Sequence, residues 1–226
     1  MSKKDEIRYT ERFFKNRKLT SSSAALIMGQ MAILLSHKPP TSILDVGCGT
    51  GEFLDAARAY WPEATTQGLE GPWVSKFREQ IGHPVWFEDF DDLESFDVLQ
   101  QKHFDLGICV EVVEHLVPET ANKIVRELTQ TCDVILFSGA VPNQHGTNHI
   151  NCRWQEEWVE DFQNLGFLGF DVVRPAIWDN PGVEWWYAQN ILVFVNIAHA
   201  DYWKDNIMWQ PKSMIRAHLV HPKSGT

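Results

Sequence analysis

The sequence lacks the features that mark a secreted or membrane-spanning protein. Its four cysteines lie far apart and form no C-x-x-C pair, so neither a disulfide framework nor a cysteine-based metal site is expected. It has no uncharged stretch of about 18 residues and no apolar leader at the start. We therefore expect a reduced, cytoplasmic protein that does not span a membrane.

Basic residues are in the minority. Twenty Lys and Arg against 30 Asp and Glu give a formal net charge of -10, and the basic side chains gather in residues 1–18 and 210–226. The acidic middle argues against a broad nucleic-acid surface, because phosphate contacts need clustered Lys and Arg. The basic ends leave room for a small anionic ligand. A small-molecule partner is expected, and nucleic acid is not.

Tryptophan, by contrast, is abundant. Seven of the ten tryptophans fall in the last third of the chain, between Trp154 and Trp209. Such side chains most often fill a core, and they also suit a ligand pocket or the interface of a homodimer. Their number alone favours none of these roles.

Apolar runs alternate with helix-like segments from residue 41 onward, which is typical of βαβ units and a parallel sheet covered on both faces. We expect an N-terminal helical cap over residues 1–40, one α/β domain over 41–200 and a C-terminal tail over 201–226. The expected strands are 42–46, 65–69, 84–87, 104–110, 133–138, 168–173 and 189–197, and the expected helices are 6–18, 24–36, 52–60, 74–80, 121–130 and 155–165.

The most informative stretch is I-L-D-V-G-C-G-T-G-E-F, residues 43–53. Three glycines, Gly47, Gly49 and Gly51, join an expected strand to an expected helix, so backbone N–H groups face the mouth of the sheet. A dinucleotide fingerprint G-x-G-x-x-G that begins at Gly47 or at Gly49 would need its third glycine at position 52 or 54, where the sequence has Glu52 and Leu54. The acidic side chain of Glu52 also disfavours a phosphate at the N-terminus of the expected helix. The loop predicts a cofactor without phosphate.

Two carboxylates follow the next two expected strands. Glu70 ends the second strand and can accept hydrogen bonds from both hydroxyls of a ribose. Asp89 follows the third strand and offers an acceptor for an exocyclic amine, while the neighbouring Phe90 offers an aromatic edge for a purine. Together they suggest an adenosine.

At this point the chain resembles the class I S-adenosylmethionine-dependent methyltransferases, from about Ser42 to Ile197. The resemblance rests on D-V-G-C-G-T-G, on Glu70, and on F-D-L-G-I-C-V-E-V-V-E-H-L around the fourth strand. It implies a doubly wound, mostly parallel seven-stranded sheet of the Rossmann-like methyltransferase fold with an N-terminal helical lid. S-adenosylmethionine is the implied cofactor. The implied cofactor-binding residues are Asp45, Gly47, Gly49, Gly51, Glu70, Asp89, Phe90, Val110 and Glu111.

Methyl transfer to an oxygen needs a base, and E-V-V-E-H places His115 just beyond the fourth strand. His115 is the first candidate for the general base, and His149 is the second catalytic candidate. Glu111, Glu114, His115 and His149 would also supply two oxygens and two imidazoles to a divalent metal, a pattern similar to small-RNA 2′-O-methyltransferases of the Hen type. Against a metal, Glu111 could line the cofactor pocket and Glu114 could open a helix.

The acceptor is expected to contact the long polar loop after the fifth strand and the aromatic segment 179–187, which we expect to form a lid. The candidates are His145, His149, Arg153, Trp185, Trp186 and Tyr187. The N-terminal residues Tyr9, Arg12 and Lys15 are expected to cover the cofactor.

The sequence thus indicates an S-adenosylmethionine-dependent methyltransferase that acts on an oxygen of a sugar, nucleotide-linked or natural-product acceptor. Two alternatives stay open at this stage. One is a metal-dependent RNA 2′-O-methyltransferase, and the other is a catalytically silent subunit that binds S-adenosylmethionine and a partner protein.

Overall fold

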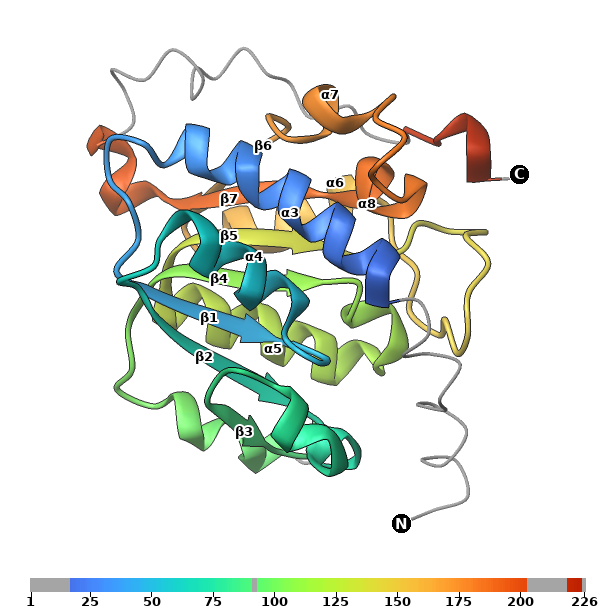
Figure 1. Ribbon diagram of the computed structural model, residues 1–226. Coiled ribbons are helices and arrows are strands. Elements are labelled where there is room, and N and C mark those ends of the chain that lie inside the picture. Colours follow the sequence, from blue (N-terminus) through green and yellow to red (C-terminus); the bar gives the residue numbers. More distant parts are fainter. Residues whose placement is uncertain (1–16, 91–92, 203–218, 225–226) are drawn as a thin grey trace.

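A central sheet of seven strands organises the protein, in the order β3-β2-β1-β4-β5-β7-β6 (Figure 1). The structure is a computed structural model that describes residues 17–90, 93–202 and 219–224. The strands are β1 (Ser42–Val46), β2 (Thr65–Glu70), β3 (Val85–Phe87), β4 (Phe104–Val110), β5 (Cys132–Ser138), β6 (Phe167–Phe170) and β7 (Leu192–Asn196).

All neighbouring strands are parallel except around β7, which runs antiparallel to both β5 and β6. The expected doubly wound, mostly parallel sheet of seven strands is confirmed. Because β7 is reversed, its first residues lie at the edge where β1, β4 and β5 end, and its last residues lie at the edge where those strands begin. Both edges therefore receive side chains from the C-terminal third of the chain.

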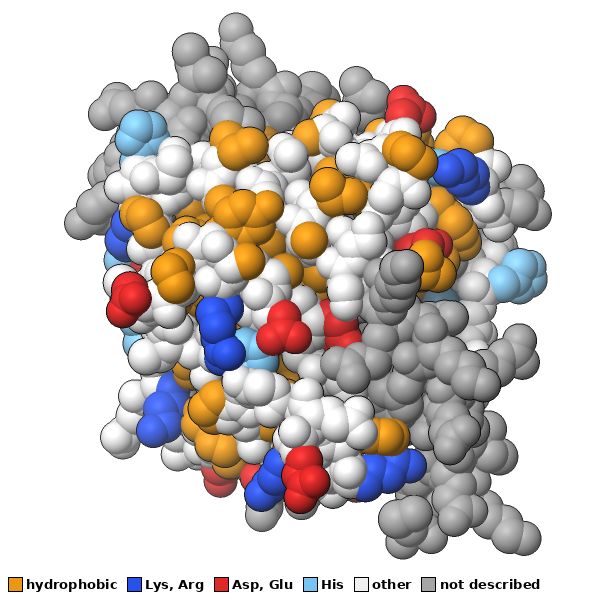
Figure 2. Space-filling view, viewed as in Figure 1, with side chains coloured by type: hydrophobic (Ala, Val, Ile, Leu, Met, Phe, Trp, Pro, Cys, Tyr) orange, Lys and Arg blue, Asp and Glu red, His pale blue; other side chains and the backbone are white. Residues whose placement is uncertain are grey.

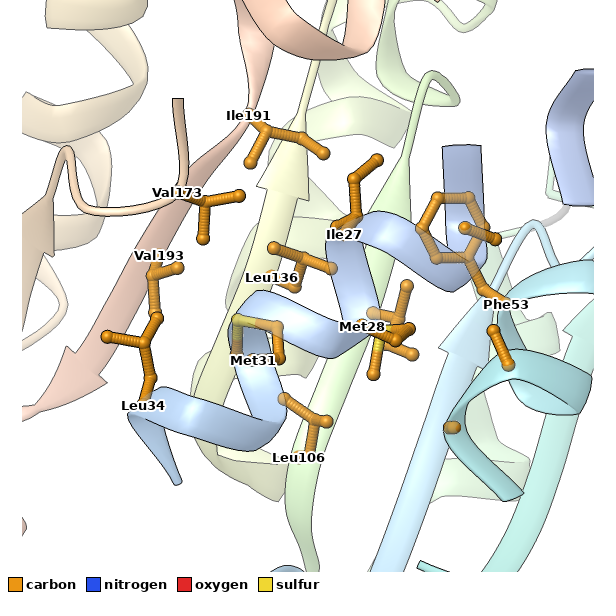
Figure 3. Close-up of a cluster of buried hydrophobic side chains, with 14 of the residues drawn as sticks. Ile27, Met28, Met31, Leu34, Phe53, Leu106, Leu136, Val173, Ile191 and Val193 are labelled. Carbon is orange, nitrogen blue, oxygen red and sulfur yellow. The ribbon is translucent and has the colours of Figure 1, made fainter. Parts of the chain in front are cut away.

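Helices cover both faces of the sheet. On one face, α3 (Arg17–Leu34) and α4 (Glu52–Tyr60) bury apolar side chains against β1, β4, β5 and β7. Figure 3 shows Met31 of α3 beside Leu106 and Leu136, and Leu34 beside Val193. On the other face, α5 (Pro118–Thr131) and α6 (Gln155–Asn164) enclose a second cluster. The result is a three-layer α/β/α arrangement.

Helix α3 begins earlier than the sequence predicts. We expected Ser21–Ser23 to cap a helix starting at residue 24, but the helix already includes Arg17. The hydroxyl of Ser23 is buried and accepts the N–H of Glu184, 3.0 Å away, so it serves a tertiary contact and not a helix cap. The helix expected over 6–18 lies almost wholly outside the described residues.

The remaining differences concern short elements. A 3₁₀ helix, η1 (Pro72–Gln80), replaces the α-helix expected over 74–80, and the last two strands are shorter than expected. Residues 174–190 hold two short helices, α7 (Arg174–Ile177) and α8 (Trp185–Asn190), where a loop and the start of a strand were expected. The other 3₁₀ turns are η2 (Leu93–Leu99), η3 (Val113–His115), η4 (Ile197–Tyr202) and η6 (Pro222–Ser224).

No helix within the described ranges is both long enough and apolar enough to cross a bilayer.

An aromatic cluster joins α6 to the sheet. Phe162 stacks on Phe194 with ring centroids 3.8 Å apart and meets Phe137 edge-on at 5.2 Å. All three rings are almost fully buried and closely packed. The surrounding side chains would therefore only partly fill the cavity that removal of one ring leaves.

We predict that Phe162→Ala lowers the free energy of unfolding by about 3–5 kcal/mol, because it removes a buried ring and leaves a cavity. Chemical denaturation measures this. Leu165→Ala, at the end of the same helix but 39% exposed, is the control and should cost about 1 kcal/mol or less. Equal losses in the two variants would contradict the packing described here.

Candidate functional site

The glycine loop joins β1 to α4 at the carboxyl edge of the sheet. Gly47, Gly49 and Gly51 all have positive φ angles of 76°, 56° and 91°, a region that side chains disfavour. A Cβ atom at Gly47 would also lie 2.3 Å from Cγ2 of Val112. Only glycine at position 47 lets the loop pass this close to the end of β4.

Glu70 ends β2 directly beneath the loop. Its carboxylate accepts the N–H of Gly49 at 2.7 Å and the N–H of Gly71 at 2.7 Å, and the residue is 3% exposed. Burial raises the pKa of Glu70 to about 7, although the two backbone hydrogen bonds act in the opposite direction. Each carboxylate oxygen has a second lone pair, so the group can also accept hydrogen bonds from a ligand.

Two more carboxyl groups lie near Glu70. Asp45 and Glu52 are both buried, and burial followed by repulsion from Glu70 and Glu52 raises the pKa of Asp45 well above its ordinary value. A phosphate placed at this loop would be repelled. A ligand with hydroxyl groups, an amine or another cationic group would be attracted.

The two residues predicted to contact adenine, Asp89 and Phe90, have different surroundings in the structure. Asp89 is exposed just after β3. Phe90 is buried and stacks on Phe96 with ring centroids 5.8 Å apart, so its side chain belongs to the core. The backbone N–H of Glu88 donates to the carbonyl of Glu70 at 2.9 Å, which holds this segment beside the ribose candidate.

Glu111 lies where β4 ends and has a positive φ of 56°. Its carboxylate accepts hydrogen bonds from Ser138 Oγ at 2.8 Å, Asn190 Nδ2 at 3.0 Å and Gln144 Nε2 at 3.4 Å. Gln144 Oε1 in turn accepts Nε2 of Gln189 at 2.9 Å. This network was not predicted from the sequence. Ser138 could have been found because it ends β5, but Asn190 was placed inside a strand.

The predicted metal ligands are only partly brought together. Glu114, His115 and His149 each offer one ligand atom, and these atoms lie within 4.8 Å of one another. Glu111 does not join them, because its carboxylate is held by Ser138 and Asn190. The cluster found in the structure therefore comprises Glu114, His115 and His149, and a ligand set that also includes Glu111 stays a prediction.

Glu114 is the most unusual group of this cluster. It is 0% exposed, and neither carboxyl oxygen makes a hydrogen bond of normal geometry with the described residues. Burial, and next the nearby Glu111, raise the pKa of Glu114 well above its ordinary value. A carboxyl group in such a place is either protonated or balanced by a cation.

The two histidines face each other. Their rings meet edge-on with centroids 5.0 Å apart. His149 Nδ1 lies 3.0 Å from the carbonyl oxygen of Gln144, to which it donates, so the neutral ring keeps an unprotonated Nε2. Burial lowers the pKa of His149, which favours this neutral form. A Cβ atom at Gly146 would clash with the ring of His149, so a side chain there would displace the ring.

The last three residues of the aromatic segment 179–187 lie in a short helix, and the role of this segment as a lid stays a prediction. Trp185, Trp186 and Tyr187 open α8, and the two tryptophans are half-buried. Tyr187 is buried and meets Phe53, in the first turn of α4, edge-on at 5.9 Å. Tyr187 thus links the start of α8 to the helix that follows the glycine loop.

The other acceptor candidates differ in their surroundings. His145 is exposed. The guanidinium of Arg153 contacts Asp161 at 2.8 Å and lies 4.0 Å from the centre of the Trp158 ring, so it is already engaged by α6. The predicted N-terminal contacts, Tyr9, Arg12 and Lys15, lie outside the described residues. Figure 2 colours the described side chains by type and draws the remaining residues in grey.

Comparisons with known proteins agree with this geometry. Residues 23–189 match a family model described as a methyltransferase domain. No curated protein sequence matches the chain significantly.

Solved structures share the fold at low identity. Magnesium protoporphyrin IX methyltransferase from Synechocystis, with bound S-adenosylhomocysteine, has a TM-score of 0.55 at 15% identity, over 81% of this chain and 87% of that one. A sugar N-methyltransferase from Streptoalloteichus has a TM-score of 0.56 at 15% identity, over 82% and 92%. An O-methyltransferase family protein from Burkholderia thailandensis has a TM-score of 0.52 at 11% identity. The match covers 76% of this chain, which spans only 57% of the length of that protein.

The family model covers well over half of the sequence and includes the glycine loop, Glu70 and the histidine pair. The chain therefore belongs to the methyltransferase-domain family.

Proposed function

We propose that this protein transfers a methyl group from S-adenosylmethionine to an oxygen of a small-molecule acceptor, such as a sugar, nucleotide-linked or natural-product compound. The observation that carries the proposal is the position of Glu70 beneath a phosphate-repelling glycine loop. This arrangement suits an adenosine ligand that bears hydroxyl groups and a positive charge but no phosphate.

The cofactor would lie across the carboxyl edge of the sheet. Glu70 would accept hydrogen bonds from the ribose hydroxyls, and Asp89 would accept one from the adenine amine. The backbone of Gly47 and Gly49 would approach the methionine part, next to Val110. When bound, the cofactor supplies an electrophilic methyl group on a sulfonium, so the protein must align the acceptor and exclude water.

His115 and His149 lie beyond β4 on the acceptor side of that site. We assign His115 as the base that takes the proton of the acceptor hydroxyl on an imidazole nitrogen. His149, held by the carbonyl of Gln144, would orient the acceptor through its unprotonated Nε2. The half-buried Trp185 and Trp186 would pack on the acceptor, and the exposed His145 would contact its outer end.

One observation favours a second candidate, a metal-dependent variant of the same transfer. The carboxyl group of Glu114 is buried without a normal hydrogen bond, next to two imidazoles. Glu114, His115 and His149 would hold a borderline divalent cation such as Mn²⁺, Co²⁺ or Zn²⁺, because mixed nitrogen and oxygen ligands suit these ions better than Mg²⁺. The ion would polarise the acceptor oxygen, and His115 would then be a ligand and not the base.

We predict that Glu70→Gln weakens S-adenosylmethionine binding at least tenfold at pH 8, because the amide loses acceptor capacity and places a donor against Gly49 or Gly71. Calorimetric titration measures the affinity. Glu79→Gln, the same change at an exposed site on η1, should bind like the wild type.

The pH dependence adds a second test of the same residue. If the cofactor binds the ionised carboxylate, a group with a pKa of about 7 makes wild-type binding about tenfold weaker at pH 6 than at pH 8. Glu70→Gln should lose most of this dependence. If Glu70→Gln keeps the wild-type affinity and pH profile, Glu70 does not bind the ribose.

We predict that His115→Gln lowers kcat for methyl transfer by about 10²- to 10⁴-fold while cofactor affinity stays within twofold, because a general base acts on the acceptor only. Transfer of label from methyl-labelled S-adenosylmethionine into fractions of a metabolite extract measures this. His37→Gln, at an exposed position after α3, is the control. Full activity of His115→Gln would exclude His115 as the base.

Chelation separates the two candidates. If the metal-dependent candidate is correct, dialysis against EDTA abolishes transfer, added Mn²⁺, Co²⁺ or Zn²⁺ restores it, and Glu114→Gln cannot be restored. If no metal takes part, activity survives EDTA. Glu114→Gln then folds and works like the wild type, because glutamine has the shape of the protonated acid. Full activity in EDTA rules out the metal-dependent candidate.

A further inference from the structure

A second cluster of charged and imidazole side chains lies at the opposite edge of the sheet, where β4 and β5 begin and β7 ends. We define the amino-edge cluster as His103, Asp105, Asp133 and His199. His103 precedes β4, Asp105 lies in β4, Asp133 lies in β5, and His199 lies in η4 directly after β7. The reversed direction of β7 places His199 at this edge.

Both histidines point to one oxygen of Asp133. The Nε2 atom of His103 lies 3.5 Å from Asp133 Oδ1, and Nε2 of His199 lies 3.3 Å from the same atom. The side chain of Asp133 is only 8% exposed, while those of His103 and His199 are 61% and 37% exposed. A buried carboxylate thus stands at the base of the cluster, and two imidazoles reach it from the solvent side.

Asp105 brings a second, rigid carboxylate. Its Oδ2 accepts hydrogen bonds from the N–H and hydroxyl of Thr41, both at 2.7 Å, and from the N–H and hydroxyl of Ser42 at 3.1 and 3.3 Å. These four donors fix the carboxylate and lower the pKa of Asp105. Its Oδ1 receives none of these bonds. One ligand atom each from His103, Asp105 and Asp133 lies within 4.8 Å of the others.

The other charged group near the cluster is compatible with an added cation. Lys38 Nζ lies 3.7 Å from Asp133 Oδ2, the oxygen on the side away from the two histidines. A shallow pocket opens here, with Asp105, Asp133 and His199 in its lining beside the apolar side chains of Leu35, Pro40 and Val134. Lys38 also lines this pocket and is 38% exposed, so it can turn into solvent.

We propose that the amino-edge cluster binds one borderline divalent transition-metal ion, such as Zn²⁺ or Co²⁺, separately from the methyl-transfer site. His103, Asp105 and Asp133 each supply one ligand atom within 4.8 Å of the others, and His199, whose Nε2 lies 3.3 Å from Asp133 Oδ1, would join them as a fourth ligand. Such mixed nitrogen and oxygen ligands suit these ions, whereas Ca²⁺ and Mg²⁺ prefer oxygen ligands alone. The ion would link η4 to the first residues of β4 and β5. Because it would tie together segments almost 100 residues apart, its role would be structural.

The experiment uses the untagged full chain carrying Glu114→Gln and His149→Gln, so that two of the three candidate ligands at the methyl-transfer site are removed. After dialysis against EDTA and removal of the chelator, the protein is titrated with Co²⁺ and followed by visible absorbance and calorimetry. We expect one saturable Co²⁺ site, competition by Zn²⁺, and a higher melting temperature with metal.

His103→Gln and His199→Gln, added singly to that background, should each weaken Co²⁺ binding at least tenfold. Both side chains are partly exposed, so these variants should fold normally, which the melting temperature of the metal-free protein checks. His37→Gln is the matched control and should leave binding unchanged. Absence of a saturable site, or binding that neither His103→Gln nor His199→Gln weakens, would overturn the proposal. Neither outcome depends on methyl transfer.

Discussion

The close approach of the glycine loop to the end of β4 is the constraint on which the site depends. Gly47 passes so near Val112 that no side chain fits between them, and Gly49 donates its N–H to Glu70 at the end of β2. The loop therefore connects three neighbouring strands, β1, β2 and β4, at one edge. The segment that begins with Glu111 follows β4 directly, so its position relative to the loop is set by the same contacts.

The reversed strand β7 is the second organising feature. Because it runs antiparallel to β5, the residues before it reach the carboxyl edge, where Asn190 donates to Glu111. The residues after it reach the amino edge, where His199 meets Asp133. If β7 ran parallel to β5, the residues before it would lie at the amino edge and those after it at the carboxyl edge, so the reversed direction decides which residues join which cluster.

Much of the central sheet could be predicted from the sequence, because β1, β4 and β5 are buried on both faces and read as continuous apolar runs. The loop could be predicted as well, since positive φ angles demand glycine. Residues whose role depends on distant contacts could not. Ser23 resembles a helix cap until its bond to Glu184 is seen, and Asn190 shows no local sign of its contact with a residue 79 positions earlier.

The arrangement of the two glutamates in E-V-V-E-H could not be predicted for a similar reason. Its spacing places both glutamates on one face only if the whole segment is a regular helix. In the structure, Glu111 adopts a left-handed conformation and only Val113–His115 forms a 3₁₀ turn. Glu111 therefore turns toward Ser138, while Glu114 turns inward to the two histidines. No sequence pattern signals this single backbone reversal.

The acidity of the carboxyl edge bears directly on the proposed chemistry. A strongly anionic pocket would attract the sulfonium of the cofactor, but it would also stabilise this positive charge in the ground state. Because methyl transfer disperses the charge, full ionisation of the carboxyl groups would slow the reaction. Burial moderates this conflict, because it raises the pKa of Asp45, Glu111 and Glu114 and raises that of Glu70 to about 7. Part of the acid set is then neutral near pH 7. The neutral fraction of Glu70 binds the ribose hydroxyls less well, but it reduces the negative field at the methyl group.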